Sequence, residues 1–171
     1  TGGVTGFKSV SEIKKHMETN GTVIGAPGTD SITNTELLHL PVDVLVPAAL
    51  ADSITASTAP GIRAKIVVEG ANAPTTPQGD AILNDKGILV VPDILANSGG
   101  VIVSYFEWVQ DKQKYFWTAD EVIENLNEIL MRAINEVAAL AQSRGVTWRE
   151  AANMLSVDRV AQAHRLRGLY P

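Results

Sequence analysis

The sequence predicts an α/β fold with a parallel sheet, and three observations support this. Short β-branched runs, "VLV", "IVV" and "ILVV", lie within residues 43–50, 64–71 and 87–93. Continuous apolar runs of this kind are typical of strands that are buried on both faces. The runs are about 22 residues apart, which leaves room for a helix between successive strands. Helix-start patterns then follow the last run, so helices are expected to close the fold.

Helix starts are marked by capping boxes, in which Ser or Thr precedes Glu by three residues. The pattern begins at Ser9, Thr118 and Thr147. Another helix is expected after Thr76, because Pro77 suits a first helical position and Gly87 suits the position beyond a helix end. The stretch "NGTVIGAPGTD" between the first capping box and the first strand is expected to be a loop.

Two long helices are predicted in the last third of the chain. Apolar residues after Thr118 recur at helical spacing to about Ser143, and Gly145 is expected to end that helix. A second helix is expected to run from Thr147 to about Leu166. We therefore predict one α/β domain over residues 1–171, with 118–171 as its closing helices.

Composition excludes several classes of function. The chain has 171 residues and a net charge of -5, and its Lys and Arg residues are scattered, unlike the basic face of a nucleic-acid-binding protein. It contains no cysteine, so disulfides and thiolate chemistry are excluded. Its three histidines lack metal-ligand spacing, so no metal site is expected. Neither a membrane span nor a signal peptide is recognisable, so a cytoplasmic location is expected.

Small and amide residues follow the three predicted strands. Ala48 and Ala49 follow the first strand, Asn72 the second and Asn97 the third. Ligands of parallel α/β sheets bind beyond the carboxyl ends of the strands. An amide offers both a donor and an acceptor, and small side chains let a flat ligand approach the backbone. The Gly99–Gly100 pair is expected to open a helix whose N-terminus faces this ligand.

These segments carry a family resemblance. "VVEGANAPTTP" followed by "VPDILANSGGVIVSYFEWVQ" closely resembles hexameric glutamate dehydrogenases, within the Glu/Leu/Phe/Val dehydrogenase superfamily, and "DVLVPAAL" and "NGTVIGAPGTDSITNTELL" match the same family. "SYFEW" with "GAN-x-PTTP" points to the glutamate branch. No G-x-G-x-x-G fingerprint occurs. The resemblance therefore implies the second half of a Rossmann-like dinucleotide-binding domain, with closing helices.

The resemblance also implies roles for individual residues. A cofactor wall for NAD or NADP would consist of Ala48, Ala49, Asn72 and Asn97, and substrate contacts would come from Asn97, Val101 and Ser104. In the family, the residue matching Ser104 binds the side-chain carboxylate of glutamate. The family's catalytic lysine and aspartate have no counterpart here, so no catalytic residue is assigned. Ala73 departs from the family pattern, because glycine is commoner at that position.

Each site residue also has a structural interpretation. Asn72 could brace a turn, and Asn97 could be the N-cap of the following helix. Ser104 could hydrogen-bond to a carbonyl one turn earlier. Asp93, directly after a strand, is expected to cap a helix or form a salt bridge rather than to act as an acid or base.

The resemblance implies a parent enzyme, a homo-hexamer, that oxidises L-glutamate to 2-oxoglutarate and ammonia with NAD or NADP. Residues 1–171 alone are expected to give no turnover. Two alternatives stay open: a non-catalytic nucleotide-binding or assembly module of the same fold, and a dehydrogenase for a hydrophobic amino acid. An incomplete sheet is also expected to expose a strand edge and an apolar face, which favours pairing with further chain or aggregation.

Overall fold

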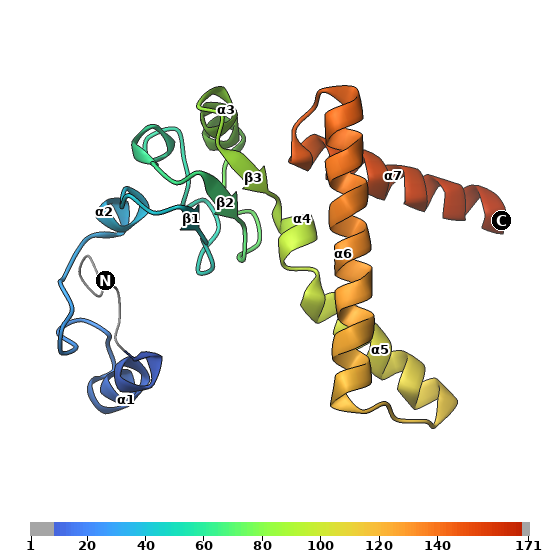
Figure 1. Cartoon of the computed structure of the whole chain (residues 1–171), viewed down its shortest axis with the longest axis horizontal. Helices are drawn as coiled ribbons and strands as arrows, with labels where there is room; N and C mark the ends of the chain where they lie inside the picture. The colour runs from blue at the N-terminus through green and yellow to red at the C-terminus, as the bar shows by residue number, and fades with distance from the viewer. Residues whose placement is uncertain (1–8, 169–171) are drawn as a thin grey trace. The chain divides into compact units, whose positions relative to one another are not determined.

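The computed structural model describes residues 9–168, and the chain divides into two compact units, Thr1–Leu40 and Pro41–Pro171 (Figure 1). The first unit contains α1 (Val10–Asn20) and α2 (Asn34–Leu38), joined by turns. The predicted loop between them is confirmed. The helix after Ser9 is confirmed too, but its predicted capping box is wrong: the Ser9 hydroxyl pairs with that of Ser11, at 2.6 Å, and caps no backbone N–H.

Helix α2 was not predicted, although the same sequence signal marks it. Thr33 and Glu36 form a complete capping box, in which the Thr33 hydroxyl accepts from the Glu36 N–H at 3.2 Å. The helix has only five residues. A helix this short has too few turns to show an apolar period, so only the cap could have revealed it.

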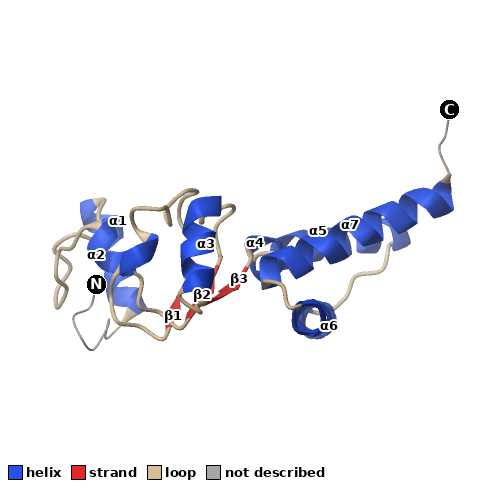
Figure 2. Cartoon of the chain, turned by 90° about the horizontal axis from the view of Figure 1, so that it is seen from above, coloured by secondary structure: helices blue, strands red, loops and turns tan. Residues whose placement is uncertain are grey.

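The second unit holds a three-stranded sheet. Strands β1 (Val44–Leu45), β2 (Ile66–Val68) and β3 (Leu89–Val91) are parallel, in the order β1-β2-β3, with Ile66 paired to both Val44 and Leu89. A short 3-10 turn, η1 (Ala59–Gly61), lies between β1 and β2, and α3 (Pro77–Asp85) lies between β2 and β3. Figure 2 shows α3 standing on one side of the sheet. The predicted parallel α/β class is confirmed.

Burial differs among the strands. Val67 in β2 is completely buried and Val90 in β3 is 5% exposed, whereas Val44 in β1 is 49% exposed. The prediction that all three strands are buried on both faces is therefore wrong for β1. Both β1 and β3 are edge strands, but α3 packs against β3, whereas β1 makes its main contacts within residues 9–168 with β2. The expected exposed edge and apolar surface are thus present, and Val46 adds to them.

The ends of α3 form as the sequence predicts. The Thr76 hydroxyl accepts from the Gly79 N–H at 3.2 Å, Pro77 occupies the first turn, and Gly87 follows the helix with φ +71°. Gly79 also brings α3 against the preceding chain, because a Cβ there would lie 2.6 Å from the carbonyl oxygen of Ile54.

Four helices follow the sheet: α4 (Asp93–Ala96), α5 (Gly99–Gln113), α6 (Ala119–Arg144) and α7 (Trp148–Arg167). The capping boxes at Thr118 and Thr147 are confirmed, and Gly145 ends α6 with φ +64°. Leu95 of α4 packs in a core with Val137 and Ala151, from α6 and α7. Within residues 9–168, no helix is both long enough and apolar enough to cross a bilayer.

Candidate functional site

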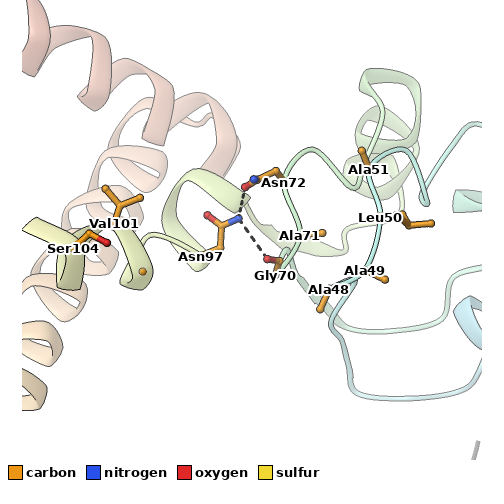
Figure 3. A pocket seen from close by; sticks show the side chains of 11 residues that line it. Ala48, Ala49, Leu50, Ala51, Gly70, Ala71, Asn72, Asn97, Val101 and Ser104 are labelled. Carbon is orange, nitrogen blue, oxygen red and sulfur yellow. Dashed lines mark hydrogen bonds between the residues drawn. The ribbon is translucent and has the colours of Figure 1, made fainter. Parts of the chain in front are cut away.

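The carboxyl ends of the three strands open onto one cavity of about 780 Å³ (Figure 3). Its lining residues come from the segments after β1 and β2 and from the α4–α5 junction: Ala48, Ala49, Leu50, Ala51, Gly70, Ala71, Asn72, Asn97, Gly100, Val101 and Ser104. All six residues that the sequence analysis assigned to a cofactor wall or substrate contact lie in this set. The expected convergence on one sheet edge is therefore confirmed.

Two asparagine side chains meet in this cavity. Asn97 Nδ2 donates a hydrogen bond to Asn72 Oδ1 at 2.7 Å and a longer one to the Gly70 carbonyl at 3.5 Å (Figure 3). Among the described residues, nothing hydrogen-bonds to Asn97 Oδ1 or Asn72 Nδ2. The pair therefore offers a ligand one acceptor and one donor, held in a fixed relation by the bond between them.

The helix-capping interpretation of Asn97 is wrong. Asn97 ends α4, and Ser98 stands before α5, where the Ser98 hydroxyl donates back to the Leu95 carbonyl at 2.9 Å. The side chain of Asn97 turns instead to Asn72, across 25 residues of sequence. The back-bonding interpretation of Ser104 is also wrong, because the Ser104 hydroxyl hydrogen-bonds to nothing within residues 9–168 and lines the cavity.

Small residues in the cavity wall let the strand-end segments approach one another closely. A Cβ at Gly70 would lie 3.1 Å from the Ala48 Cβ, which is too close without movement, so glycine lets the two strand-end segments pack together. Gly99 and Gly100 form the first turn of α5, as predicted. A Cβ at Gly100 would meet no atom of residues 9–168 within 4 Å. Packing against the described part of the chain therefore does not require glycine at position 100.

The turn that carries Asn72 is held in a costly conformation. Ala73 has φ +46°, a left-handed conformation that costs about 1–2 kcal/mol for a residue with a Cβ. Glycine, which lacks a Cβ, would adopt this conformation at little cost. The Ala73 N–H donates to Asp93 Oδ2 at 2.7 Å, and the Ala73 carbonyl accepts from the Asp52 N–H at 3.0 Å. These two bonds offset the cost and fix the turn.

A partly buried charged cluster adjoins this turn. Arg149 of α7 donates through Nη1 to Glu69 Oε2 at 3.0 Å and through Nη2 to Glu69 Oε1 at 2.7 Å. Arg149 Nη2 also reaches Asp80 Oδ1 at 3.1 Å, and Arg149 Nη1 lies 3.8 Å from Asp93 Oδ1. Glu69 is completely buried. The salt-bridge interpretation of Asp93 is confirmed, whereas no sequence pattern indicated a role for Arg149.

The Arg149 guanidinium stays charged in this cluster. Burial lowers its pKa, but hydrogen bonds and charge attraction from Glu69 and Asp80 outweigh that effect and raise the pKa above its usual value. The three carboxylates do not form a metal site: the described part of the chain holds no group of His, Asp or Glu side chains arranged for a metal ion.

Comparison with known proteins identifies the family. The profile of the Glutamate/Leucine/Phenylalanine/Valine dehydrogenase family matches residues 3–168. A glutamate dehydrogenase from Thermotoga maritima is 53% identical over 162 residues, which is 95% of this chain and 39% of that protein. An NAD-specific glutamate dehydrogenase from Peptoniphilus asaccharolyticus is 47% identical over 159 residues, 93% of this chain and 38% of that protein.

A solved structure supports the same family assignment. The hetero-hexameric glutamate dehydrogenase of Thermus thermophilus, in a leucine-bound form, superposes with a TM-score of 0.89 at 36% identity, over 98% of this chain and 39% of that one. The chain therefore spans about two fifths of the length of the relatives it matches. Since the family profile covers nearly all of the sequence, the chain belongs to the Glutamate/Leucine/Phenylalanine/Valine dehydrogenase family.

Proposed function

We propose that this chain forms the nicotinamide-facing wall of an NAD- or NADP-dependent L-glutamate dehydrogenase and contributes a contact to the substrate carboxylate. The observation that carries this proposal is the 2.7 Å bond between Asn97 and Asn72, in the same cavity as Ser104. The cavity thus contains both a fixed donor–acceptor pair, from the two asparagines, and the free hydroxyl donor of Ser104. The relatives from Thermotoga and Peptoniphilus, both glutamate dehydrogenases, support it.

The cavity wall fits the flat, amide-bearing end of a nicotinamide cofactor. Ala48, Ala49 and Gly70 present little side-chain bulk, so a planar ring can approach the backbone. The free acceptor on Asn97 and the free donor on Asn72 suit a carboxamide or a ribose hydroxyl, each of which both donates and accepts. When bound, NAD or NADP supplies a hydride acceptor for the Cα–H bond of glutamate.

The residues of this chain would orient the reactants rather than move protons. Asn97 would fix the ring and the substrate, Val101 would exclude water, and the Ser104 hydroxyl would donate to the side-chain carboxylate of glutamate. The carboxylates nearest the amide pair, Glu69 and Asp93, already accept hydrogen bonds from Arg149 and the backbone. We therefore expect no turnover from residues 1–171 alone and assign proton transfer to another part of the enzyme.

Assembly is part of the proposal. The Thermus thermophilus relative is a hetero-hexamer, and we propose that the enzyme containing this chain is likewise an oligomer, with a homo-hexamer as the first expectation. Four of the similar curated proteins are named NAD-specific. Residues that choose between NAD and NADP are expected outside this chain, because the dinucleotide fingerprint is absent from it.

One alternative within the family has support of its own. The L-tryptophan dehydrogenase of Nostoc punctiforme also superposes on this chain, with a TM-score of 0.65 at 26% identity. The identities of 53% and 47% to glutamate dehydrogenases favour glutamate over a hydrophobic amino acid. A non-catalytic binding or assembly module would retain the fold without the activity.

A chimaera tests these possibilities. In it, residues 3–168 replace the matching segment of the Thermotoga maritima glutamate dehydrogenase. We expect glutamate-dependent reduction of NAD or NADP. The variant Ser104→Ala should lower kcat/KM for glutamate about 10- to 100-fold, because a hydrogen bond to a charged group contributes about 1.5–3 kcal/mol. As a matched control, Ser143→Ala removes an exposed hydroxyl on α6 and should leave kcat/KM unchanged.

The outcomes separate the three functions. A folded, oligomeric chimaera without turnover of any amino acid would favour the non-catalytic module. Turnover of leucine or tryptophan in preference to glutamate, unaffected by Ser104→Ala, would favour the hydrophobic substrate.

A further inference from the structure

An arginine from α7 reaches the strand-end segments that carry the amide pair. Arg149 and Glu69 form a two-pronged ion pair at 2.7 and 3.0 Å, although 80 residues separate them. The rigid fork of a guanidinium fixes the orientation of the partner carboxylate as well as its distance. Neither residue lines the cavity, so both would act on a ligand only through other residues.

Glu69 is connected to Asn97. Besides Arg149, Glu69 Oε2 accepts the backbone N–H of Asp93 at 2.9 Å. Asp93 begins the single turn of α4, and its carbonyl accepts the N–H of Asn97 at 3.0 Å. Glu69 therefore fixes the first residue of the turn that ends at Asn97.

Asp93 is also connected to Asn72. Its carboxylate accepts the N–H of Ala73 at 2.7 Å, and this bond holds the left-handed turn directly after Asn72. The other oxygen of the same carboxylate lies 3.8 Å from Arg149 Nη1. Both segments that carry the amides are thus attached to one partly buried charged cluster.

We propose that Arg149 and Glu69 are positioning residues for the nicotinamide pocket: through Asp93, they hold Asn72 and Asn97 at hydrogen-bond distance. The assignment of this cavity to nicotinamide rests on the proposed function, whereas the hydrogen bonds that hold the two asparagines do not. Packing alone does not require the ion pair, because desolvation offsets much of the attraction in a buried pair and apolar residues often pack as well. The Arg149–Glu69 pair is connected through Asp93 to both turns that carry the asparagines, and this arrangement suits a positioning role.

Kinetics of the chimaera test the proposal. Glu69→Gln preserves shape but removes the charge that Arg149 pairs with, and we expect kcat for glutamate to fall about 10-fold, as for other supporting shells. The decisive background carries both Asn72→Ala and Asn97→Ala. If Glu69 acts through the amide pair, Glu69→Gln should change kcat less than two-fold when both asparagines are already Ala, whereas a general structural defect would multiply with them.

A matched control lies on the same helix. Arg159 pairs with Glu136 on the exposed surface of α6 and α7. Arg159→Gln should leave kcat within two-fold of the unmodified chimaera, while Arg149→Gln should reproduce the loss seen for Glu69→Gln. Should either variant at the cluster fail to fold, Arg149→Lys keeps the positive charge beside Glu69, loses the fork, and should give a smaller loss of the same kind.

Crystal structures of the cofactor-free chimaera give a readout independent of activity. In Glu69→Gln and Arg149→Lys, we expect Asn97 Nδ2 to lie beyond 3.5 Å from Asn72 Oδ1, instead of at 2.7 Å. If the unmodified chimaera has no activity but the variants show separated amides, the positioning role would be supported and the proposed function overturned. An unchanged amide contact, or losses in kcat that multiply in the background that carries both Asn72→Ala and Asn97→Ala, would overturn the positioning role.

Discussion

Two polar clusters meet at the carboxyl ends of β2 and β3, and they differ in almost every physical respect. The amide pair, Asn72 and Asn97, is neutral, lines an open cavity and leaves one donor and one acceptor unused. The charged cluster of Arg149, Glu69, Asp80 and Asp93 is largely buried. Arg149 hydrogen-bonds to Glu69 and Asp80 and forms a longer ion pair with Asp93. Asp93 connects the two, because its carboxylate holds the turn beside Asn72.

The difference separates recognition from support. A ligand can use only groups that the protein has left unpaired, so the amide pair suits binding but contributes little to folding. A buried charge, by contrast, is costly unless it is paired, so the fold is stable only if the residues of the charged cluster keep their partners. We therefore expect substitutions in the charged cluster to affect stability strongly and those in the amide pair to affect it weakly.

The largest effect is expected from Arg149→Met. This change leaves the completely buried Glu69 without its partner, and breaking a buried pair costs about 3–5 kcal/mol. Urea denaturation of the chain, followed by circular dichroism, should show the corresponding fall in the free energy of unfolding. Arg159→Gln, which breaks the exposed pair with Glu136, should cost less than about 1 kcal/mol. Equal losses for the two arginines would contradict the contrast between buried and exposed pairs.

The two clusters also differ in how far the sequence reveals them. Ala48, Asn72 and Asn97 each follow a β-branched run, and the geometry of parallel sheets brings such residues to one edge. Their convergence could therefore be predicted without long-range information. The bond between Asn97 and Asn72 could not, because α4 has only four residues and gave no periodic signal.

The charged cluster left only local signals in the sequence. The capping box at Thr147 correctly predicted that α7 starts at Trp148, one residue before Arg149. Nothing in the sequence links Arg149 to Glu69, since their contact depends on how α7 packs beside β3. In the same way, burial of β1 could not be judged from its "VLV" run, because burial depends on which helices pack against the strand, and α3 and α7 pack against β3 but not closely against β1.

An intermediate effect is expected from Thr147→Ala at the start of α7. The Thr147 hydroxyl accepts from the Glu150 N–H at 3.2 Å, and loss of such an N-cap costs about 1 kcal/mol. Thermal unfolding should show a lower midpoint. Thr118→Ala removes the equivalent cap from α6 and serves as the comparison. If fraying at α7 loosens Arg149, amide hydrogen exchange at Asp93 should accelerate in Thr147→Ala and not in Thr118→Ala.

A smaller effect on stability is expected from Asn97→Ala. It removes the exposed bond to Asn72 and the longer one to the Gly70 carbonyl, and it leaves both partners accessible to water. The cost should therefore lie near 0.5 kcal/mol, the lower end for hydrogen bonds. Urea denaturation measures it directly. A loss as large as that of Arg149→Met would mean that the amide pair supports the fold, and recognition and support would no longer be separate.

The smallest effect concerns Glu150, the exposed neighbour of Arg149. Hydrogen bonds from the Thr147 N–H and then the Thr147 hydroxyl hold the pKa of Glu150 below its usual value of 4.5. A lowered folded-state pKa stabilises the fold above about pH 4.5, and this contribution is lost as the pH falls through the folded-state value. The difference in unfolding free energy between the natural chain and Glu150→Gln should therefore shrink on acidification below pH 4.5. Carbon-13 NMR of the Glu150 carboxyl should give a midpoint below 4.5, and a midpoint at or above 4.5 would contradict the capping geometry at the helix that carries Arg149.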